Sequence, residues 1–268
     1  MLALIAGNGR LPELLAERWR QAGRELMVCA YSGAPEAVPP DIRFRLESLG
    51  GLVRRLRREG VHEVCFAGGI TRPKLSLRYL DFPTLLLVPR LVRALGKGDD
   101  GALRELIALF EENGMAVRGA HEILPELLPE PGVPTRAQPG PEDRKDAARG
   151  EAIVTAMGAA DVGQACVVAR RQALAIEAMP GTDWMLASLR HRPDGLPEGG
   201  LLFKAPKPGQ DRRVDLPTIG PATIRAAGEA GLRGVVIEAG GVILLDREAA
   251  LEAADAAGLF LWVRPRGG

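Results

Sequence analysis

The residues best suited to chemistry lie in one stretch of the chain, residues 204–220, with the sequence KAPKPGQDRRVDLPTIG. It holds four cations and two carboxylates, namely Lys204, Lys207, Arg212, Arg213, Asp211 and Asp215. Clustered cations neutralise phosphate oxygens, and Mg²⁺ typically takes one or two protein carboxylates together with substrate phosphates and water. Prolines stiffen the stretch, which lies between an expected strand and an expected helix. We therefore expect a phosphate site here; the alternative is a solvated loop whose charges compensate one another.

Composition narrows the classes of ligand. The formal net charge is +1 and aromatic residues make up 4% of the chain, which argues against a nucleic-acid-binding protein. Among the 35 Lys and Arg residues, lysine occurs at only five positions, 74, 97, 145, 204 and 207. Two of these lie in the charged stretch, which indicates a need for a compact ammonium group rather than a planar guanidinium.

The cysteines and the hydropathy pattern indicate the cellular compartment in which the protein is expected to work. Cys29, Cys65 and Cys166 are scattered in apolar runs, which is typical of buried, reduced thiols in the cytoplasm. The three histidines have no zinc-ligand spacing. No apolar run approaches the ~18–20 residues of a membrane span, and the first apolar run is too short for a signal peptide. We expect a cytoplasmic protein, with peripheral contact at the inner face of the inner membrane left open.

The first half of the chain alternates between expected strands and helices. Strands are expected at 2–6, 25–30, 61–67 and 115–119, and helices at 11–21, 46–56, 83–95 and 101–113. Such repeated βα units predict an α/β fold with a Rossmann-like parallel sheet. Ligands of these sheets bind at the carboxyl ends of the strands. That edge is expected to carry Gly7, Gly9, Gly68 and His121.

The first glycine loop, Gly7-Asn8-Gly9, only partly matches a dinucleotide-binding fingerprint. Pro12 stands where the third glycine belongs, and no acidic residue ends the second strand, so an NAD enzyme is disfavoured. A phosphate or carbonyl group could still bind at this helix N-terminus. A tight turn without a ligand is an equally good interpretation.

The second half is expected to form a separate α/β or α+β domain. We predict a first domain at 1–133, a proline-rich linker at 134–146 and a second domain at 147–268. Helices are expected at 146–159, 183–189, 222–230 and 248–257, the second of them capped by Thr182 or Asp183. The expected strands are 165–169 paired with 173–178, then 201–205, 235–239, 242–245 and 259–263. The stretch 204–220 is expected to have no secondary structure of its own.

One apolar segment, residues 82–95, is flanked by arginines. It could line an apolar chamber or rest on an anionic membrane surface. An ordinary core helix is the interpretation that we favour.

Several motifs together resemble the LpxI-type UDP-2,3-diacylglucosamine pyrophosphatases of lipid A biosynthesis. The similarity runs through nearly the whole chain, and it is most specific in Lys204-Ala-Pro-Lys207-Pro and Arg213-Val-Asp-Leu-Pro-Thr-Ile-Gly220. The other segments are Leu4-Ile-Ala-Gly7-x-Gly9-x-Leu11-Pro12, Cys65-Phe-Ala-Gly68, Arg72-Pro73, Lys97-Gly-Asp-Asp100, Gly119-Ala-His121-Glu122, Asp161-Val-Gly-Gln164 and Gly181-Thr-Asp183.

The resemblance implies a hydrolase that uses Mg²⁺, with Mn²⁺ as a substitute, and splits the substrate into UMP and 2,3-diacylglucosamine 1-phosphate. It also implies two domains with the lipid product held between them, and Asp215 as the metal ligand. We expect Asp215, Lys204 and Arg213 to be catalytic. Substrate contacts are expected from Lys207, Gln210, Thr182, Asp183, Thr218, Gly7, Gly9, Gly68 and His121. A homodimer is left open, and so are two other functions: a hydrolase of soluble nucleotide sugars and a non-enzymatic protein that binds a nucleotide-linked lipid.

Overall fold

The computed structural model describes residues 1–32, 38–69, 76–95 and 99–267. The chain divides into two compact units. Unit 1 comprises Met1–Pro125 together with Asp211–Asp215, and unit 2 comprises Glu126–Gln210 together with Leu216–Gly268. The segment Asp211–Asp215 therefore belongs to unit 1, although the chain on both sides of it belongs to unit 2.

Unit 1 is built on a five-stranded sheet in the order β3-β2-β1-β4-β5. The strands are β1 (Leu2–Ala6), β2 (Leu26–Tyr31), β3 (Ile42–Phe44), β4 (Glu63–Ala67) and β5 (Ala116–Arg118). Every pairing is parallel, which confirms the predicted Rossmann-like sheet. The sequence prediction missed β3, because three residues are too few to show an alternating pattern.

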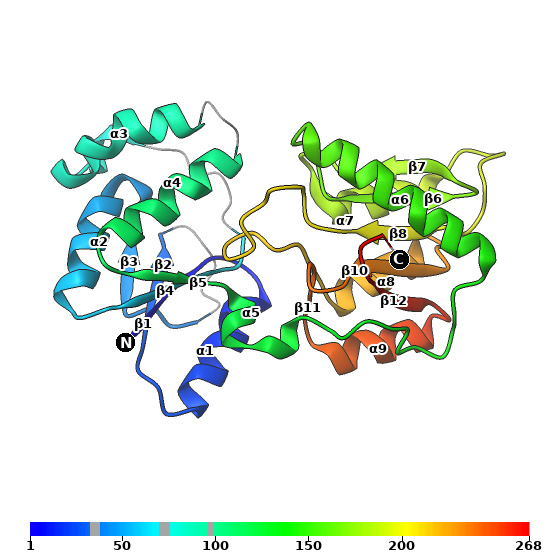
Figure 1. Cartoon of the computed structure of the whole chain (residues 1–268), viewed down its shortest axis with the longest axis horizontal. Helices are drawn as coiled ribbons and strands as arrows, with labels where there is room; N and C mark the ends of the chain where they lie inside the picture. Colours follow the sequence, from blue (N-terminus) through cyan, green and yellow to red (C-terminus); the bar gives the residue numbers. More distant parts are fainter. Residues whose placement is uncertain (33–37, 70–75, 96–98, 268) are drawn as a thin grey trace. The chain divides into compact units, whose positions relative to one another are not determined.

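Helices cover both faces of this sheet (Figure 1). They are α1 (Arg10–Gln21), α2 (Leu49–Arg58), α3 (Phe82–Leu95), α4 (Asp99–Glu112) and the short α5 (Ala120–Ile123). On one face, Leu52 and Leu56 of α2 and Phe110 of α4 pack with Ala3 and Ile5 of β1. Helix α1 packs on β1 and β2, whereas α3 packs mainly on α2 and α4 rather than on the sheet. Helix α3 therefore lies outside the layer of helices that contacts the sheet.

Unit 2 contains a second five-stranded sheet in the order β12-β10-β8-β6-β7. Strands β8 (Leu201–Lys204), β10 (Gly234–Glu238) and β12 (Phe260–Arg264) are parallel. Strand β6 (Ala165–Ala169) is antiparallel to β8 and to β7 (Gln172–Ile176). The predicted pairing of two strands in this region is confirmed. Together the two units form the predicted α/β fold class.

The helices of unit 2 lie on opposite faces of its sheet. Helix α6 (Pro141–Ala159) packs on the face formed by Val168, Phe203 and Val236. The other face is covered by α7 (Gly181–Ser188), α8 (Pro221–Glu229) and α9 (Arg247–Ala256). Helix α6 begins five residues before the predicted start, because Pro141 occupies its first turn and the Asp143 side chain accepts a hydrogen bond from Gly140 N at 2.8 Å.

The segment predicted as a linker makes contacts within unit 2. Thr135 Oγ1 accepts a hydrogen bond from Leu261 N at 2.9 Å, and Gly132, just before the predicted linker, forms a β-bridge with Val263. The predicted domain borders at 133 and 147 stay a prediction.

A two-residue strand interrupts the charged stretch 204–220, contrary to the expectation that it has no secondary structure. Strand β9 (Thr218–Ile219) pairs with β11 (Ile243–Leu244) in a small parallel sheet. Ile219 O accepts a hydrogen bond from Leu245 N at 2.9 Å at the point where the chain turns into α8. Propensity is a weak signal for a strand this short.

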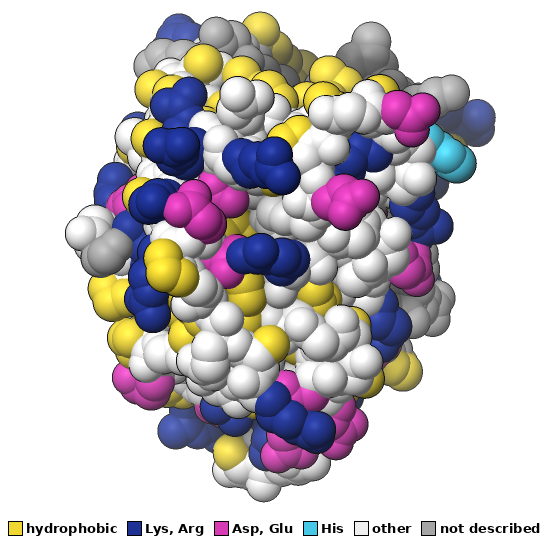
Figure 2. Space-filling model, turned by 90° about the vertical axis from the view of Figure 1, so that its right-hand side faces the viewer, with side chains coloured by type: hydrophobic (Ala, Val, Ile, Leu, Met, Phe, Trp, Pro, Cys, Tyr) yellow, Lys and Arg dark blue, Asp and Glu magenta, His cyan; other side chains and the backbone are white. Residues whose placement is uncertain are grey.

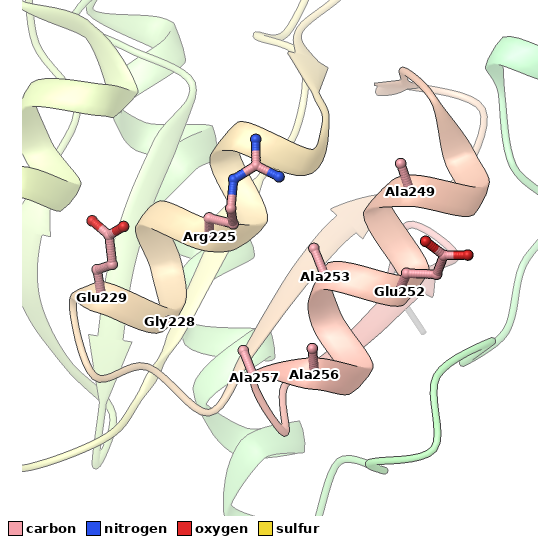
Figure 3. A pocket seen from close by; sticks show the side chains of 8 residues that line it. All are labelled: Arg225, Gly228, Glu229, Ala249, Glu252, Ala253, Ala256 and Ala257. Carbon is pink, nitrogen blue, oxygen red and sulfur yellow. The ribbon is translucent and has the colours of Figure 1, made fainter.

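An open groove between α8 and α9 is lined by small residues together with Arg225, Glu229 and Glu252 (Figure 3). Its floor is made of small residues, and a Cβ atom at Gly228 would lie 3.3 Å from Ala257 Cβ. These residues allow the two helices to approach closely, so the groove is explained by helix packing. It contains none of the predicted site residues.

Basic and acidic side chains are interspersed on the molecular face shown in Figure 2. In the part of the chain that the structure describes, no helix is long and apolar enough to cross a membrane. All three cysteines are buried and unpaired, and burial raises the pKa of Cys29, Cys65 and Cys166 to about 12.

Candidate functional site

The charged stretch contributes residues to both units. Lys204 ends β8, and the chain as far as Gln210 belongs to unit 2; Asp211–Asp215 then pack with unit 1 before β9 returns the chain to unit 2. The candidate residues therefore form two sets, one in each unit.

In unit 2, Lys204 lies at the centre of a buried polar network. Its side chain is only 6% exposed, and its Nζ donates a hydrogen bond to Thr182 Oγ1 at 2.8 Å. Thr182 Oγ1 in turn donates to Glu177 Oε1 at 2.5 Å, and Glu177 Oε2 accepts a bond from Gln164 N at 2.9 Å. The hydroxyl thus links a buried ammonium group to a buried carboxylate, an arrangement that offsets part of the desolvation of both charges.

Burial lowers the pKa of Lys204, while the charges of Glu177 and Asp183 act in the opposite direction. Asp183 lies exposed in α7. A buried ammonium group with only part of its charge compensated gains strongly from an anionic ligand. The Gln164 residue adjoins Glu177 in this network, and its Oε1 atom is buried without a hydrogen-bond partner.

The prediction that Thr182 or Asp183 caps α7 is wrong. The residue that precedes the first helical position is Pro180, and no side chain caps the helix. The Thr182 hydroxyl is instead occupied by Lys204 and Glu177.

Lys207 and Gln210 form a second cluster in unit 2. Lys207 Nζ makes an ion pair with Asp161 Oδ1 at 2.6 Å, and Lys207 N donates to Gln210 Oε1 at 2.9 Å. This turn lies against α6, since a Cβ atom at Gly158 would come within 2.5 Å of Pro208 Cδ. Gln210 is 8% exposed, so its amide fixes the backbone of the turn.

In unit 1, Arg213 is held by two carboxylates. Its Nε and Nη2 atoms donate to Asp211 at 3.0 and 2.8 Å, and its Nη1 donates to Glu111 Oε1 on α4 at 2.7 Å. The hydrogen bonds from Arg213 lower the pKa of Asp211, and those to Asp211 and Glu111 raise the pKa of Arg213 further. The guanidinium group is therefore always charged and fixed in direction.

Asp215 supplies a carboxylate at the other end of the same short segment. It is half-buried, and its backbone N donates to Asp211 O at 3.3 Å. Asp211 is bonded to Arg213, and the expectation that Asp215 binds a metal stays a prediction. Among the described residues there is no group of three or more His, Cys, Asp or Glu that could hold a metal ion. A single carboxylate fits Mg²⁺, which keeps several waters and binds substrate phosphates, and does not fit a closed zinc site.

The glycines after β1 and β4 are required by backbone packing. A Cβ atom at Gly7 would lie 2.5 Å from Gly69 O, and one at Gly68 would lie 2.4 Å from Asn8 O. Asn8 and Gly69 exchange backbone hydrogen bonds at 2.8 and 3.1 Å. Gly9 adopts a φ of +99° immediately before α1. The tight-turn interpretation thus accounts for Gly7, Gly9 and Gly68 without a ligand.

His121 and Arg213 both lie close to Gly119. A Cβ atom at Gly119 would come within 2.5 Å of the His121 ring and 3.3 Å of Arg213 Cα. The His121 Nδ1 atom is buried without a hydrogen-bond partner. Unit 1 thereby brings together two of the predicted site residues at the carboxyl end of β5.

Comparison with known proteins places this site in a family. The LpxI N-terminal domain model matches residues 1–127 and the LpxI C-terminal domain model matches residues 130–262. A curated protein of Caulobacter vibrioides, named UDP-2,3-diacylglucosamine pyrophosphatase LpxI, is 40% identical over 97% of this chain and 96% of its own length. The chain belongs to the LpxI family.

Among solved structures, the UDP-glucose 4-epimerase of Thermus thermophilus in complex with NAD is similar to this LpxI-family chain with a TM-score of 0.30. It is 19% identical, over 99% of this chain and 86% of the epimerase. A score this low supports no conclusion about fold or function.

Some predicted residues of this LpxI-family chain lie apart from the networks above. Thr218 lies in β9, where its hydroxyl donates to Leu216 O at 3.4 Å. Lys97 and Arg72-Pro73, which carry part of the resemblance, lie outside the described residues.

Sequence reasoning did not predict which carboxylates hold the cations of this LpxI-family site; they are Glu177, Asp161, Glu111 and Asp211. For Glu177 a signal existed. Gln164 directly precedes one of two strands predicted to pair, and Glu177 lies near the end of the other, so these ends must meet. For Glu111 no signal existed, because it lies 102 residues before Arg213.

Proposed function

We propose that this chain hydrolyses the pyrophosphate bond of UDP-2,3-diacylglucosamine, which yields UMP and 2,3-diacylglucosamine 1-phosphate in lipid A biosynthesis. Membership of the LpxI family and the name of the Caulobacter relative support the substrate. The observation that carries the proposal is the charged stretch, in which Lys204, Arg213 and Asp215 provide two fixed cations and a carboxylate.

The reaction requires charge neutralisation and the positioning of water. The oxygen of water forms a bond to one phosphorus, the bond from that phosphorus to the bridging oxygen breaks, and its electron pair stays on the bridging oxygen. Two phosphate monoesters result. Lys204, Lys207 and Arg213 would bind phosphate oxygens, because fixed cations stabilise the charge that develops on them.

The buried network explains how Lys204 would be held ready. Thr182 and Glu177 fix its ammonium group at the end of β8. A group that is fixed and desolvated before the substrate binds needs little reorganisation, and its interaction with a phosphate is strong in a medium of low dielectric constant. The charge of Asp183 on α7 favours the charged form of Lys204. Gln210 fixes the neighbouring turn by accepting a hydrogen bond from Lys207 N.

We propose that Asp215 holds Mg²⁺, for which Mn²⁺ can substitute. A bound Mg²⁺ would neutralise charge on the phosphate oxygens. Asp215 would hold the metal through a single carboxylate.

The remaining predicted contacts concern the rest of the substrate. His121, with its buried unpartnered Nδ1, is the best candidate in unit 1 for a polar contact to the substrate. Gly9 and Gly68, which are exposed, and the buried Gly7 stay candidates at the edge of the sheet, and Thr218 is a further candidate in unit 2. A homodimer and a cytoplasmic location stay predictions.

An assay of the Asp215→Ala variant tests the metal assignment. We expect wild-type protein to release UMP only when Mg²⁺ or Mn²⁺ is present, and the variant to lose turnover while its circular dichroism spectrum and melting temperature stay close to those of wild type. Substantial turnover by Asp215→Ala, or undiminished wild-type turnover in a chelator, contradicts the assignment. Lys145→Ala, which removes an exposed lysine on α6, is the matched control and should keep full activity.

A further inference from the structure

Exposed apolar side chains of unit 1 gather on one helix. Among the described residues of this unit, the large hydrophobic side chains that are exposed are Tyr79, Phe82, Leu85, Leu86 and Val92. Phe82 is 69% exposed, and Leu86 and Val92 are each 62% exposed. Four of them lie in α3, and Tyr79 lies three residues before its start.

Their spacing places these residues on one side of α3. Phe82, Leu85, Leu86, Pro89 and Val92 follow one another at intervals of three, one, three and three residues, and all are exposed; we call them the α3 face. This is the spacing of the apolar side of an amphipathic helix, which in an ordinary surface helix is turned toward the core. The expectation that residues 82–95 form an ordinary core helix is wrong for this side.

Polar contacts fix the other side of α3 against the unit. Thr84 Oγ1 accepts a hydrogen bond from Gly50 N of α2 at 2.8 Å. Arg90 donates to Glu112 of α4 at 2.7 and 2.9 Å and also pairs with Glu105. Asp81, directly before the helix, accepts bonds from Gly51 N and Thr84 N. These bonds hold the helix in one rotation, with the α3 face outward.

Exposed arginines lie beside the α3 face, whereas Asp81 before the helix is half-buried and bonded to backbone N–H groups. The helix sequence FPTLLLVPRLVRAL contains no Asp or Glu, Arg93 is exposed, and so is Arg78, just before the helix. An apolar helix face flanked by exposed arginines is complementary to an anionic lipid surface. A second copy of the chain that docked symmetrically through the same face would bring like charges together.

We propose that the α3 face docks unit 1 on the surface of an anionic lipid bilayer. Phe82, Leu85, Leu86 and Val92 enter the head-group region, and Arg78 and Arg93 contact lipid phosphates. The inference goes beyond the proposed hydrolysis and does not depend on it.

Co-sedimentation with vesicles tests this inference. The full-length protein is mixed, without substrate, with vesicles of phosphatidylcholine alone or with one third phosphatidylglycerol. We expect wild type to bind the anionic vesicles, and the double variant Phe82→Ser/Leu86→Ser to bind them roughly tenfold more weakly, because two exposed apolar side chains are removed. Leu196→Ser, which changes a 43% exposed leucine of unit 2, is the matched control and should bind like wild type. Arg78→Gln/Arg93→Gln should weaken binding to anionic vesicles only, and provides the test if the apolar variant fails to fold.

Three results overturn the inference. The first is equal sedimentation of wild type and both double variants. The second is a dimer in analytical ultracentrifugation that Phe82→Ser/Leu86→Ser converts to a monomer, which assigns the face to a second copy. The third is that Phe82→Ser/Leu86→Ser binds vesicles like wild type but loses turnover of detergent-dispersed substrate, which assigns the face to the acyl chains of the substrate. Since vesicle binding is measured without substrate, its failure is distinct from a failure of the proposed hydrolysis.

Discussion

Replacing Thr182 with valine removes the hydroxyl that joins Lys204 to Glu177 without changing the shape of the side chain. In the wild type this hydroxyl accepts one bond from an ammonium group at 2.8 Å and donates another to a carboxylate at 2.5 Å. All three side chains are less than 9% exposed, so water cannot readily replace either bond. Each of the two charged groups loses one hydrogen bond in the variant.

The expected loss follows from the number and kind of these bonds. Hydrogen bonds to charged groups contribute about 1.5–3 kcal/mol each, so we expect Thr182→Val to lower the free energy of unfolding by about 3 kcal/mol or more. For a domain of this size that corresponds to a fall in melting temperature of roughly 6–12 °C. Thr182→Ser keeps the hydroxyl and should lose less than about 1 kcal/mol.

Thermal and urea unfolding, followed by circular dichroism, measure both variants. If Thr182→Val is as stable as Thr182→Ser to within about 0.5 kcal/mol, the hydroxyl does not stabilise the buried charges and the network is wrongly described. Turnover gives an independent reading, because Thr182→Val should also reduce kcat by releasing the Lys204 ammonium group from its fixed position.

Packing and charge elsewhere in the chain lead to three more expected outcomes. Gly7→Ala should cost about 1–3 kcal/mol in unfolding free energy, because its Cβ would lie 2.5 Å from Gly69 O. Gly69→Ala, which has open space and an ordinary φ, should be nearly neutral, and equal stability of the two variants in urea unfolding would contradict the packing. The buried thiols, with pKa values of about 12, should not react with a thiol reagent at pH 8 until the protein is denatured; rapid labelling of the native protein would show that they are accessible. The Arg213 hydrogen bonds lower the pKa of Asp211, so its stabilising effect is complete above the unfolded pKa of about 3.9 and is lost as the pH falls through the lower folded value. The difference in melting temperature between wild type and Asp211→Asn should therefore be larger at pH 7 than at pH 3, and a constant difference would refute the assignment.

Much of the fold could be predicted because apolar runs of five residues, such as Leu2–Ala6 and Ala165–Ala169, are buried strands in a sheet covered on both faces. The short strands β3 and β9 could not, since pairing with a neighbour rather than local sequence creates them. Which side of α3 faces outward could not be predicted either, because it depends on the ion pairs of Arg90 with Glu105 and Glu112 of another helix.

The cations of the candidate site could be predicted from their density, but their partners could not. Lys204 was identified by position, whereas its burial follows from the place of β8 inside the second sheet. Glu111 and Glu177 hold the cations across gaps of 102 and 27 residues in the chain, and only the folded topology brings them there. The Thr182 hydroxyl was expected to cap a helix, but it bonds to the buried charged groups of Lys204 and Glu177 instead.

The identity of the products tests the central claim most directly. Purified protein is incubated with UDP-2,3-diacylglucosamine and Mg²⁺, and the products are separated and identified by mass spectrometry, with UDP-N-acetylglucosamine as the substrate that lacks acyl chains. The account predicts equal amounts of UMP and 2,3-diacylglucosamine 1-phosphate from the lipid substrate, and little or no UMP from the soluble nucleotide sugar. Binding of the lipid substrate without release of UMP, or equally fast cleavage of both substrates, would contradict it.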